Sequence, residues 1–285
     1  MNLVFAVTGY TAPMAAGECR PRQSAIRSQP STMETANFRI YGIGRLPNAR
    51  GIGDSFETLR SLLSRTWLGE RVLADWSPKC DVVVHPTVAS YTRAVGQDQF
   101  ATLGSSRVDT MGGRITLRRL DIRADQTGWF AAAVPHELTH VIMADEFRAG
   151  QLPAWADEGM AVLADTPAKQ ALHLRDFNTG RRSGSTLRLV SFVGASGYPS
   201  PENIPVFYGQ SVSLVKYLVE RRSPADFVRF LHRVDEVGCD TALAEVYGFC
   251  GVADLERQWR TATSATTENI RTVLASPGAA VSQAS

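Results

Sequence analysis

The sequence predicts an α+β protein, with strands gathered in the N-terminal half and helices in the C-terminal half. Three short segments before residue 126 have the β-branched or alternating pattern that is typical of strands. After residue 126, apolar residues recur at helical spacing in one segment after another. The apolar content of 44% and the charged content of 20% are ordinary for a soluble globular protein with a substantial core.

The N-terminal half is predicted to hold three strands and one amphipathic helix. The strands are Phe38–Tyr41, Asp81–His85 and Arg114–Arg123. In the third strand the apolar residues change face midway, which indicates a β-bulge, and Gly112-Gly113 marks the turn before it. The helix begins at Asp54 or Ser55, ends at Gly69 and places four apolar residues on one face: Leu59, Leu62, Leu63 and Trp67.

The C-terminal half is predicted to be helical. Its first helical segment runs from Trp129 to Phe147, with Pro135 either kinking the helix or starting a new one, and ends at Gly150. A second helix covers residues 154–164. The remaining predicted helices cover residues 207–222, 224–234, 241–248 and 252–262.

Both ends of the chain lack a periodic apolar pattern. We therefore expect a leader or flexible arm over residues 1–36, a folded part over 37–263 (strand-rich to 126, helical from 127) and a flexible tail over 264–285. The apolar and small residues near the N-terminus have no basic residue before them. If residues 1–17 are a clipped export signal, the protein is secreted or periplasmic; otherwise it is cytoplasmic.

Charge and cysteine content narrow the class of partners. A net charge of +2 gives no reason to expect a nucleic-acid partner, and no segment reaches the roughly 18 to 20 apolar residues that span a membrane. The four cysteines include no CxxC pair, so a cysteine zinc site is not expected. Cys239 and Cys250 either form a disulfide or stay as buried thiols.

One segment carries a recognisable chemical pattern, His136-Glu137-Leu138-Thr139-His140. Residues i and i+4 share one face of a helix, so both imidazoles can bind one metal ion. Glu137 is placed to take a proton from water that the metal makes more acidic. Because the flanking residues are apolar, the helix is expected to be buried, and buried histidines need partners such as a shared ion.

A second helix supplies the third expected ligand. Glu158 lies in its first turns, 17 residues separate it from His140, and small residues at Gly159 and Ala161 allow a close approach of helices. Two neutral imidazoles and one carboxylate, with an open fourth position, make a typical catalytic zinc site. The predicted ligands of one Zn²⁺ are therefore His136, His140 and Glu158.

Together, His136–His140 and Trp155–Ala161 resemble the gluzincin metallopeptidases, in particular the bacterial peptidase-MA-like group that is distantly similar to thermolysin. The resemblance is strong over residues 130–165 and weaker as far as Trp259. It implies a zincin-like fold, His136, His140 and Glu158 as zinc ligands, and Glu137 as general base.

The resemblance also raises expectations for the surroundings of the site. Gluzincins often stabilise the oxyanion with a Tyr or His, for which Tyr208 is the first candidate and His173 a weaker one. A core tyrosine is the alternative for Tyr208. The strand Arg114–Arg123 would form the upper edge of the cleft and pair with an extended substrate.

The sequence departs from thermolysin-like enzymes one helical turn after Glu158. Those enzymes carry an acidic residue there, whereas this chain has Val162. One of three other carboxylates is therefore expected to orient a histidine instead, and the choice between them stays open at this point: Asp145, Asp157 or Asp165.

These features predict a zinc-dependent peptidase that hydrolyses a peptide or protein substrate through activated water and Glu137. Two alternatives stay open. One is a non-catalytic zinc-containing protein that holds a peptide, and the other is a scaffold whose helical region docks a partner. No sequence pattern sets the oligomeric state.

Overall fold

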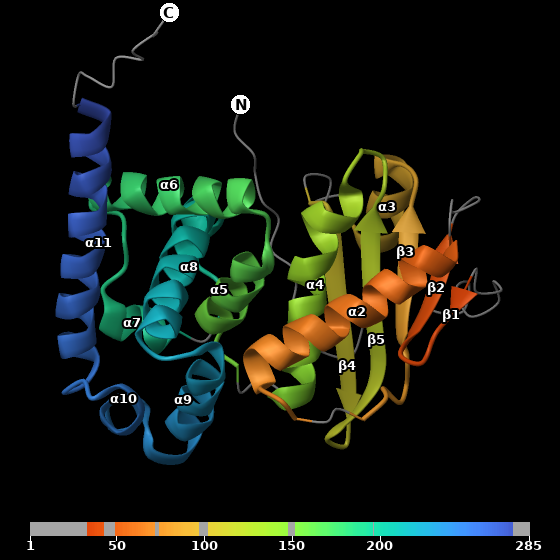
Figure 1. The fold of residues 1–285 in the computed structure, drawn as a ribbon, viewed down its shortest axis with the longest axis horizontal. Helices are drawn as coiled ribbons and strands as arrows, with labels where there is room; N and C mark the ends of the chain where they lie inside the picture. Colours follow the sequence, from red (N-terminus) through yellow and green to blue (C-terminus); the bar gives the residue numbers. More distant parts are fainter. Residues whose placement is uncertain are drawn as a thin grey trace, which may run out of the picture.

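The computed structural model describes residues 33–42, 49–71, 74–96, 102–147, 152–195 and 197–275, the side chains of 49, 50 and 265–275 excepted. Residues 1–32 lie outside the described residues, and with them most of the predicted N-terminal arm and the segment on which the predicted localisation depends. A sheet with its helices forms one half of the molecule and a group of helices forms the other (Figure 1). The predicted α+β architecture is confirmed.

The sheet has five strands in the order β1-β2-β3-β5-β4. The central strands β2 (Phe38–Gly42), β3 (Cys80–His85) and β5 (Arg114–Arg123) are parallel. The short β1 (Met33–Glu34) and β4 (Gly104–Met111) are antiparallel and form the two edges.

The prediction that Arg114–Arg123 forms the edge of the cleft is wrong, because β5 pairs with β3 on one side and with β4 on the other. The tight turn at Gly112-Gly113 folds β4 back along β5, and β4 thereby takes the edge position. The predicted bulge is present in β5, where Thr116 is the extra residue between the paired positions Ile115 and Leu117.

Two helices accompany the strands in the N-terminal half, α2 (Ala49–Leu68) and α3 (Val88–Val95). The predicted start of α2 is wrong: Asp54 and Ser55 lie inside the helix, which begins earlier. Leu63 and Trp67 are buried as expected, whereas Leu62 is 58% exposed and turns away from the core.

The remaining helices follow one another along the chain. They are α4 (Trp129–Glu146), α5 (Ala154–Ala164), α6 (Pro167–Ser183), α7 (Leu189–Val193), a 3₁₀ turn η2 (Pro201–Asn203), α8 (Ile204–Arg221), α9 (Pro224–Val237), α10 (Cys239–Tyr247) and α11 (Val252–Ala275). α4 continues through Pro135 as a single helix, and α11 runs on beyond the predicted end of the folded part at 263. The predicted helix end at Gly150 lies outside the described residues.

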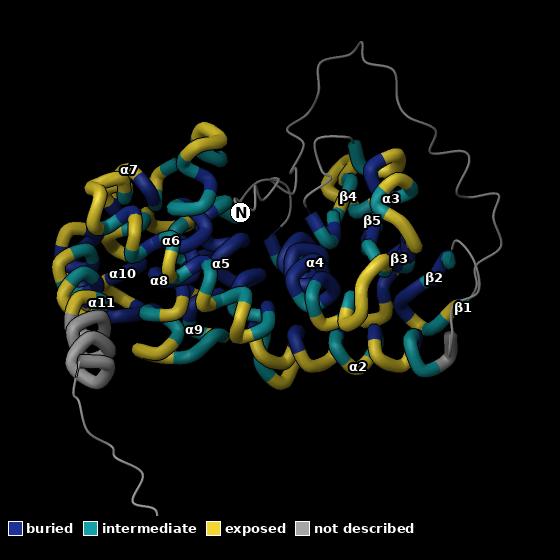
Figure 2. The backbone as a smooth tube through the Cα atoms, turned by 90° about the horizontal axis from the view of Figure 1, so that it is seen from above, coloured by how far each residue is buried: buried dark blue, intermediate teal, exposed yellow. Residues whose placement is uncertain are grey.

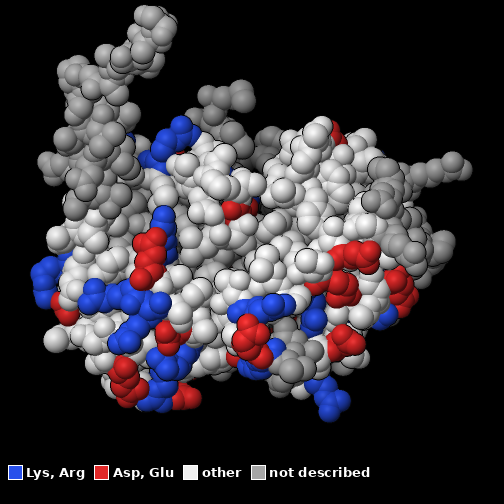
Figure 3. Space-filling model, viewed as in Figure 1, with Lys and Arg blue, Asp and Glu red and all other residues white. Residues whose placement is uncertain are grey.

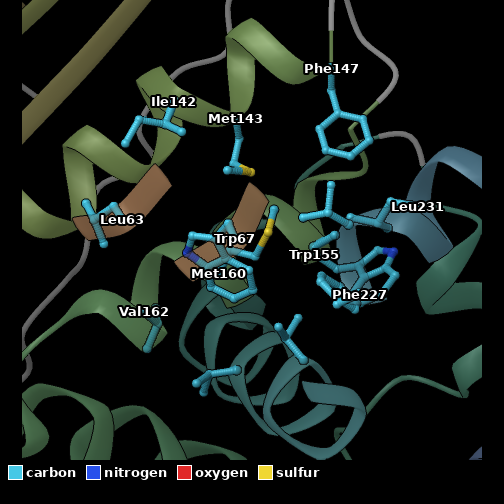
Figure 4. Close-up of a cluster of buried hydrophobic side chains, with 14 of the residues drawn as sticks. Leu63, Trp67, Ile142, Met143, Phe147, Trp155, Met160, Val162, Phe227 and Leu231 are labelled. Carbon is cyan, nitrogen blue, oxygen red and sulfur yellow. The ribbon is translucent and has the colours of Figure 1, made fainter. Parts of the chain in front are cut away.

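A cluster of large apolar side chains joins the two halves (Figure 4). The ring of Phe227 in α9 lies 6.4 Å from that of Trp67 in α2 and 6.0 Å from that of Trp155 in α5. Met143 and Phe147 extend the cluster from α4. Figure 2 shows that α4 and α5 are largely buried at this junction. Because aromatic side chains bury large areas, this cluster holds α4 and α5 beside one another.

Glycines allow α8 to approach its neighbours closely. A Cβ atom on Gly159 of α5 would lie 2.3 Å from Cγ2 of Val215 in α8. A Cβ atom on Gly209 of α8 would lie 2.3 Å from the carbonyl oxygen of His173 in α6. The close approach predicted for Gly159 therefore occurs, with α8 as the neighbour.

The sheet face opposite α4 carries a buried ionic cluster. Asp121 lies 2.8 Å from Nε2 of His85 and accepts a 2.7 Å hydrogen bond from Arg119. Burial alone would raise the pKa of Asp121, but the bonds from His85 and Arg119 outweigh it and hold the pKa below its usual value.

Replacing Asp121 by Asn is expected to lower the free energy of unfolding by about 3 kcal/mol at pH 7, because the buried His85 and the partly buried Arg119 lose the carboxylate that they contact. Since the pKa of Asp121 is lowered in the folded state, its stabilisation is present above its unfolded value and lost on acidification. The difference from wild type should therefore shrink below about pH 4, as measured by urea unfolding. Asp109→Asn, which removes an exposed partner of Arg107, should cost at most about 1 kcal/mol.

Candidate metal centre

His136 and His140 project from one face of α4, as the HExxH spacing predicts. Both side chains are buried, with exposed fractions of 6% each, and their ring centroids lie 5.0 Å apart. The Nε2 atom of His140 has no hydrogen-bond partner among the described residues. A buried ring nitrogen in that state indicates a site for a cation or another ligand.

Glu158 faces both rings from α5. Its Oε2 atom lies 3.5 Å from Nε2 of His136 and 3.8 Å from Nε2 of His140. The three ligand atoms all lie within 4.8 Å of one another. Two atoms that each sit about 2.0–2.1 Å from a tetrahedral metal ion lie about 3.4 Å apart. The three residues therefore fit one metal ion, and the predicted metal-ligand group is brought together by the fold.

Two aspartates orient the rings from the other side. Nδ1 of His136 lies 3.0 Å from Oδ2 of Asp165, and Nδ1 of His140 lies 2.8 Å from Oδ1 of Asp157. Because an ionised carboxylate can only accept a hydrogen, these contacts favour the hydrogen on each Nδ1, and in the neutral form of each ring the Nε2 lone pair then faces Glu158.

The open choice among three aspartates is therefore settled. Asp157 and Asp165 each orient one histidine, and Asp145 instead forms an ion pair with Arg118. Asp157 precedes Glu158 on α5, and Asp165 is the C-cap of the same helix.

The electrostatics of the site favour positive charge. Burial alone would lower the pKa of His140, but the charge of Asp157 outweighs it and raises the pKa to about 10. Burial also opposes a raised pKa at His136, where the charge of Asp165 prevails. Burial would raise the pKa of Glu158, but its contacts with the two rings lower it to about 2. Such a field also stabilises a bound divalent cation.

Glu137 lies beside this group and not within it. Its side chain is 4% exposed, and its Oε2 atom has no hydrogen-bond partner among the described residues. The start of β4 packs directly against it: a Cβ atom on Gly104 would lie 2.6 Å from Cγ and 3.0 Å from Oε1 of Glu137. Only a glycine leaves room for this position of the carboxylate.

Gly104→Ala is therefore expected to displace the Glu137 carboxylate. In the peptidase that the sequence predicts, this displacement should lower kcat about 10- to 100-fold, since a misplacement of roughly 1 Å can cost that much. Metal affinity should stay within about twofold, because the three atoms nearest to the added Cβ all belong to Glu137 and not to a proposed ligand. Steady-state kinetics and metal titration measure the two quantities. Gly194→Ala, at a glycine where the nearest atom to an added Cβ lies 3.4 Å away, should change neither, and an unchanged kcat for Gly104→Ala would contradict the expectation.

Two tyrosines and a histidine lie on the helical side of the group. The hydroxyl of Tyr198 donates a 2.6 Å hydrogen bond to Oε1 of Glu158. Burial and the Glu158 charge raise the pKa of Tyr198 well above 10, so it keeps this proton. Tyr208 is buried in α8 and stacks on His173, with ring centroids 5.4 Å apart. Burial, with nearby Lys169, lowers the pKa of His173 to about 4, so its ring is neutral at pH 7.

Tyr198 has no signal in the sequence. It stands 40 residues after Glu158, between α7 and η2, in a segment without periodicity. Only the bond to Glu158 identifies it. The other two histidines contact carboxylates elsewhere: His85 contacts Asp121, and His232 contacts Glu146.

The three described cysteines take no part in this site. Cys80, Cys239 and Cys250 are free thiols, so the disulfide considered for the last two is not formed. The alternative of buried thiols is wrong as well, because Cys239 is partly buried and Cys250 is exposed. On the face shown in Figure 3, basic and acidic side chains are interspersed over both halves and do not form a single basic patch. Among the described residues, no helix has both the length and the apolar character to cross a bilayer.

Comparison with known proteins agrees with this geometry. The family model of the Peptidase MA superfamily matches residues 114–265, which is more than half of the 285-residue chain. The matched region includes β5, both helices of the metal group and most of the helical half. No curated protein matches the chain. With its buried His136, His140 and Glu158 in the HExxH…E arrangement, the chain belongs to the Peptidase MA superfamily.

Proposed function

We propose that the protein is a zinc-dependent peptidase that hydrolyses peptide bonds in peptide or protein substrates. The observation that carries this proposal is the buried group of His136, His140 and Glu158 with the Glu137 carboxylate beside it. Two imidazoles and one carboxylate are the donor set that catalytic zinc prefers. Membership of a peptidase superfamily supports the reaction class.

Zinc held by His136, His140 and Glu158 would supply a Lewis acid, which polarises a carbonyl and makes water acidic near neutral pH. Glu137 then accepts a proton from the attacking water and donates it to the nitrogen of the leaving amine. Its burial and its Oε2 atom, which has no hydrogen-bond partner in the described part of the chain, suit this transfer. Asp157 and Asp165 keep both rings in the tautomer that presents Nε2.

Tyr208 is proposed to donate a hydrogen bond to the oxyanion that forms when water attacks the carbonyl. In support, its ring packs on His173, and it lies near enough to Tyr198, the partner of Glu158, to oppose ionisation of that hydroxyl. His173 is assigned a packing role beneath this ring. Tyr208→Phe is the variant that isolates the hydroxyl.

The substrate is proposed to bind along β4. This strand pairs with β5 on one side only, and its Gly104 end packs against Glu137. An extended peptide can add to such an edge through backbone hydrogen bonds, which places a scissile bond beside the general base. Pairing with an extended substrate, which the sequence analysis expected of Arg114–Arg123, is thus proposed for β4 instead.

The decisive experiment measures metal content and hydrolysis of unfolded casein, with and without a chelator. The proposal predicts one zinc per chain and hydrolysis that stops on chelation and returns with zinc. Bound zinc without hydrolysis would favour the non-catalytic peptide-binding protein. Absence of both metal and hydrolysis would refute the metal centre.

A further inference from the structure

We propose that Tyr198 is a positioning residue of the metal centre, which holds Glu158 so that a single carboxylate oxygen faces the two histidines. This inference rests on the proposed metal site and extends it to a residue outside the HExxH…E pattern. Its basis is the 2.6 Å hydrogen bond from the Tyr198 hydroxyl to Oε1 of Glu158.

The two oxygens of Glu158 have different surroundings. Oε1 accepts the bond from Tyr198, whereas Oε2 lies 3.5 Å and 3.8 Å from the Nε2 atoms of His136 and His140. Glu158 is fully buried, so water does not compete for either oxygen. A charge-assisted bond to Oε1 therefore favours ligation through Oε2 alone. Ligation through one oxygen keeps a coordination position open for water or substrate.

Each of the three ligand residues thus has its own orienting partner. Asp165 holds His136, Asp157 holds His140, and Tyr198 holds Glu158. The aspartates come from α5 and its C-cap, while Tyr198 comes from the segment between α7 and η2. Partners of this kind affect metal affinity about 10- to 100-fold when they are removed.

The ring of Tyr198 is itself fixed by packing. Its centroid lies 5.5 Å from that of Phe207, which in turn contacts Phe192 of α7 at 5.6 Å. Tyr198→Phe keeps this ring contact and removes only the hydroxyl, so the variant is expected to fold. A matched control is Tyr217→Phe, which removes the hydroxyl of another partly buried tyrosine that accepts a bond from Arg221 and packs near Phe249.

The test measures zinc affinity by competition with a chromogenic chelator. Tyr198→Phe is expected to bind zinc about 10- to 100-fold more weakly than wild type, whereas Tyr217→Phe should bind as tightly as wild type. The Co²⁺-substituted variant should also show weaker visible absorption bands, because Glu158 can then ligate through both oxygens and raise the coordination number. Thermal unfolding in excess chelator reports any purely structural effect of the substitution.

The outcomes separate this inference from the proposed function. If wild type binds one zinc ion and Tyr198→Phe binds it equally tightly, the inference is overturned while the metal site stands. A variant that is less stable in chelator but has unchanged zinc affinity overturns it too, since its role is then structural. If wild type binds no metal, the proposed function and the inference fail together.

Discussion

Glu137→Gln is expected to reduce peptide hydrolysis by about 10²- to 10⁴-fold while one zinc ion stays bound. The amide occupies the same space beside Gly104 but cannot accept a proton from water. Because Glu137 lies outside the ligand group, His136, His140 and Glu158 keep their arrangement. Turnover of unfolded casein and the zinc content of the purified variant are the two measurements.

A control on the same helix makes this result specific. Glu146→Gln changes a carboxylate at the end of α4 that contacts Arg71 and His232, away from the metal group. Its turnover should stay within about twofold of wild type. Substantial turnover by Glu137→Gln, with the control behaving as wild type, would rule out Glu137 as the general base.

Glu158→Gln is expected to weaken zinc binding by more than about 10²-fold. This loss is larger than the loss expected when a residue that only orients a ligand is removed. The substitution replaces the charged ligand atom with a neutral amide and removes the negative charge that faces both rings. Wild type should gain about 2.7 kcal/mol of stability at a zinc concentration 100 times its Kd, because zinc binds the folded state. The variant should show almost none of this gain in thermal unfolding.

The Glu146→Gln protein serves again as the matched control and should keep the full zinc-dependent shift of its unfolding temperature. An equal shift in Glu158→Gln would mean that the carboxylate is not a ligand. Asp165→Asn should fall between the two, since it leaves all three ligands in place and removes only the partner of His136.

The metal group was predictable because local rules govern it. The i, i+4 spacing fixes the relation of His136 to His140 on any helix, and the apolar flanks indicated a buried helix. Glu158 lay on a second helix whose bounds, 154–164, agree with α5. The sequence left three candidate aspartates for orienting the histidines. It could not show which of them do so, because that depends on how α4 and α5 are rotated against one another.

The features that sequence reasoning missed depend on contacts between distant segments. β4 is an edge strand rich in serine, arginine and aspartate, and most of its residues are not buried. It therefore lacks the β-branched or alternating apolar pattern from which a strand is predicted. Tyr198 has no local signal, since its role comes entirely from reaching Glu158. α2 begins before its predicted caps, because its early turns pack near β1 and β2.

The position of the ligands on the two halves of the molecule has a thermodynamic consequence. His136 and His140 belong to α4, which packs on the sheet, whereas Glu158 belongs to α5, which packs on α6 and α8. Any motion that separates the halves lengthens the distances between ligand atoms and so weakens the affinity for the ion. By reciprocity, an ion bound there restrains that motion by the same free energy, so metal binding and the rigidity of the junction between the two halves are linked.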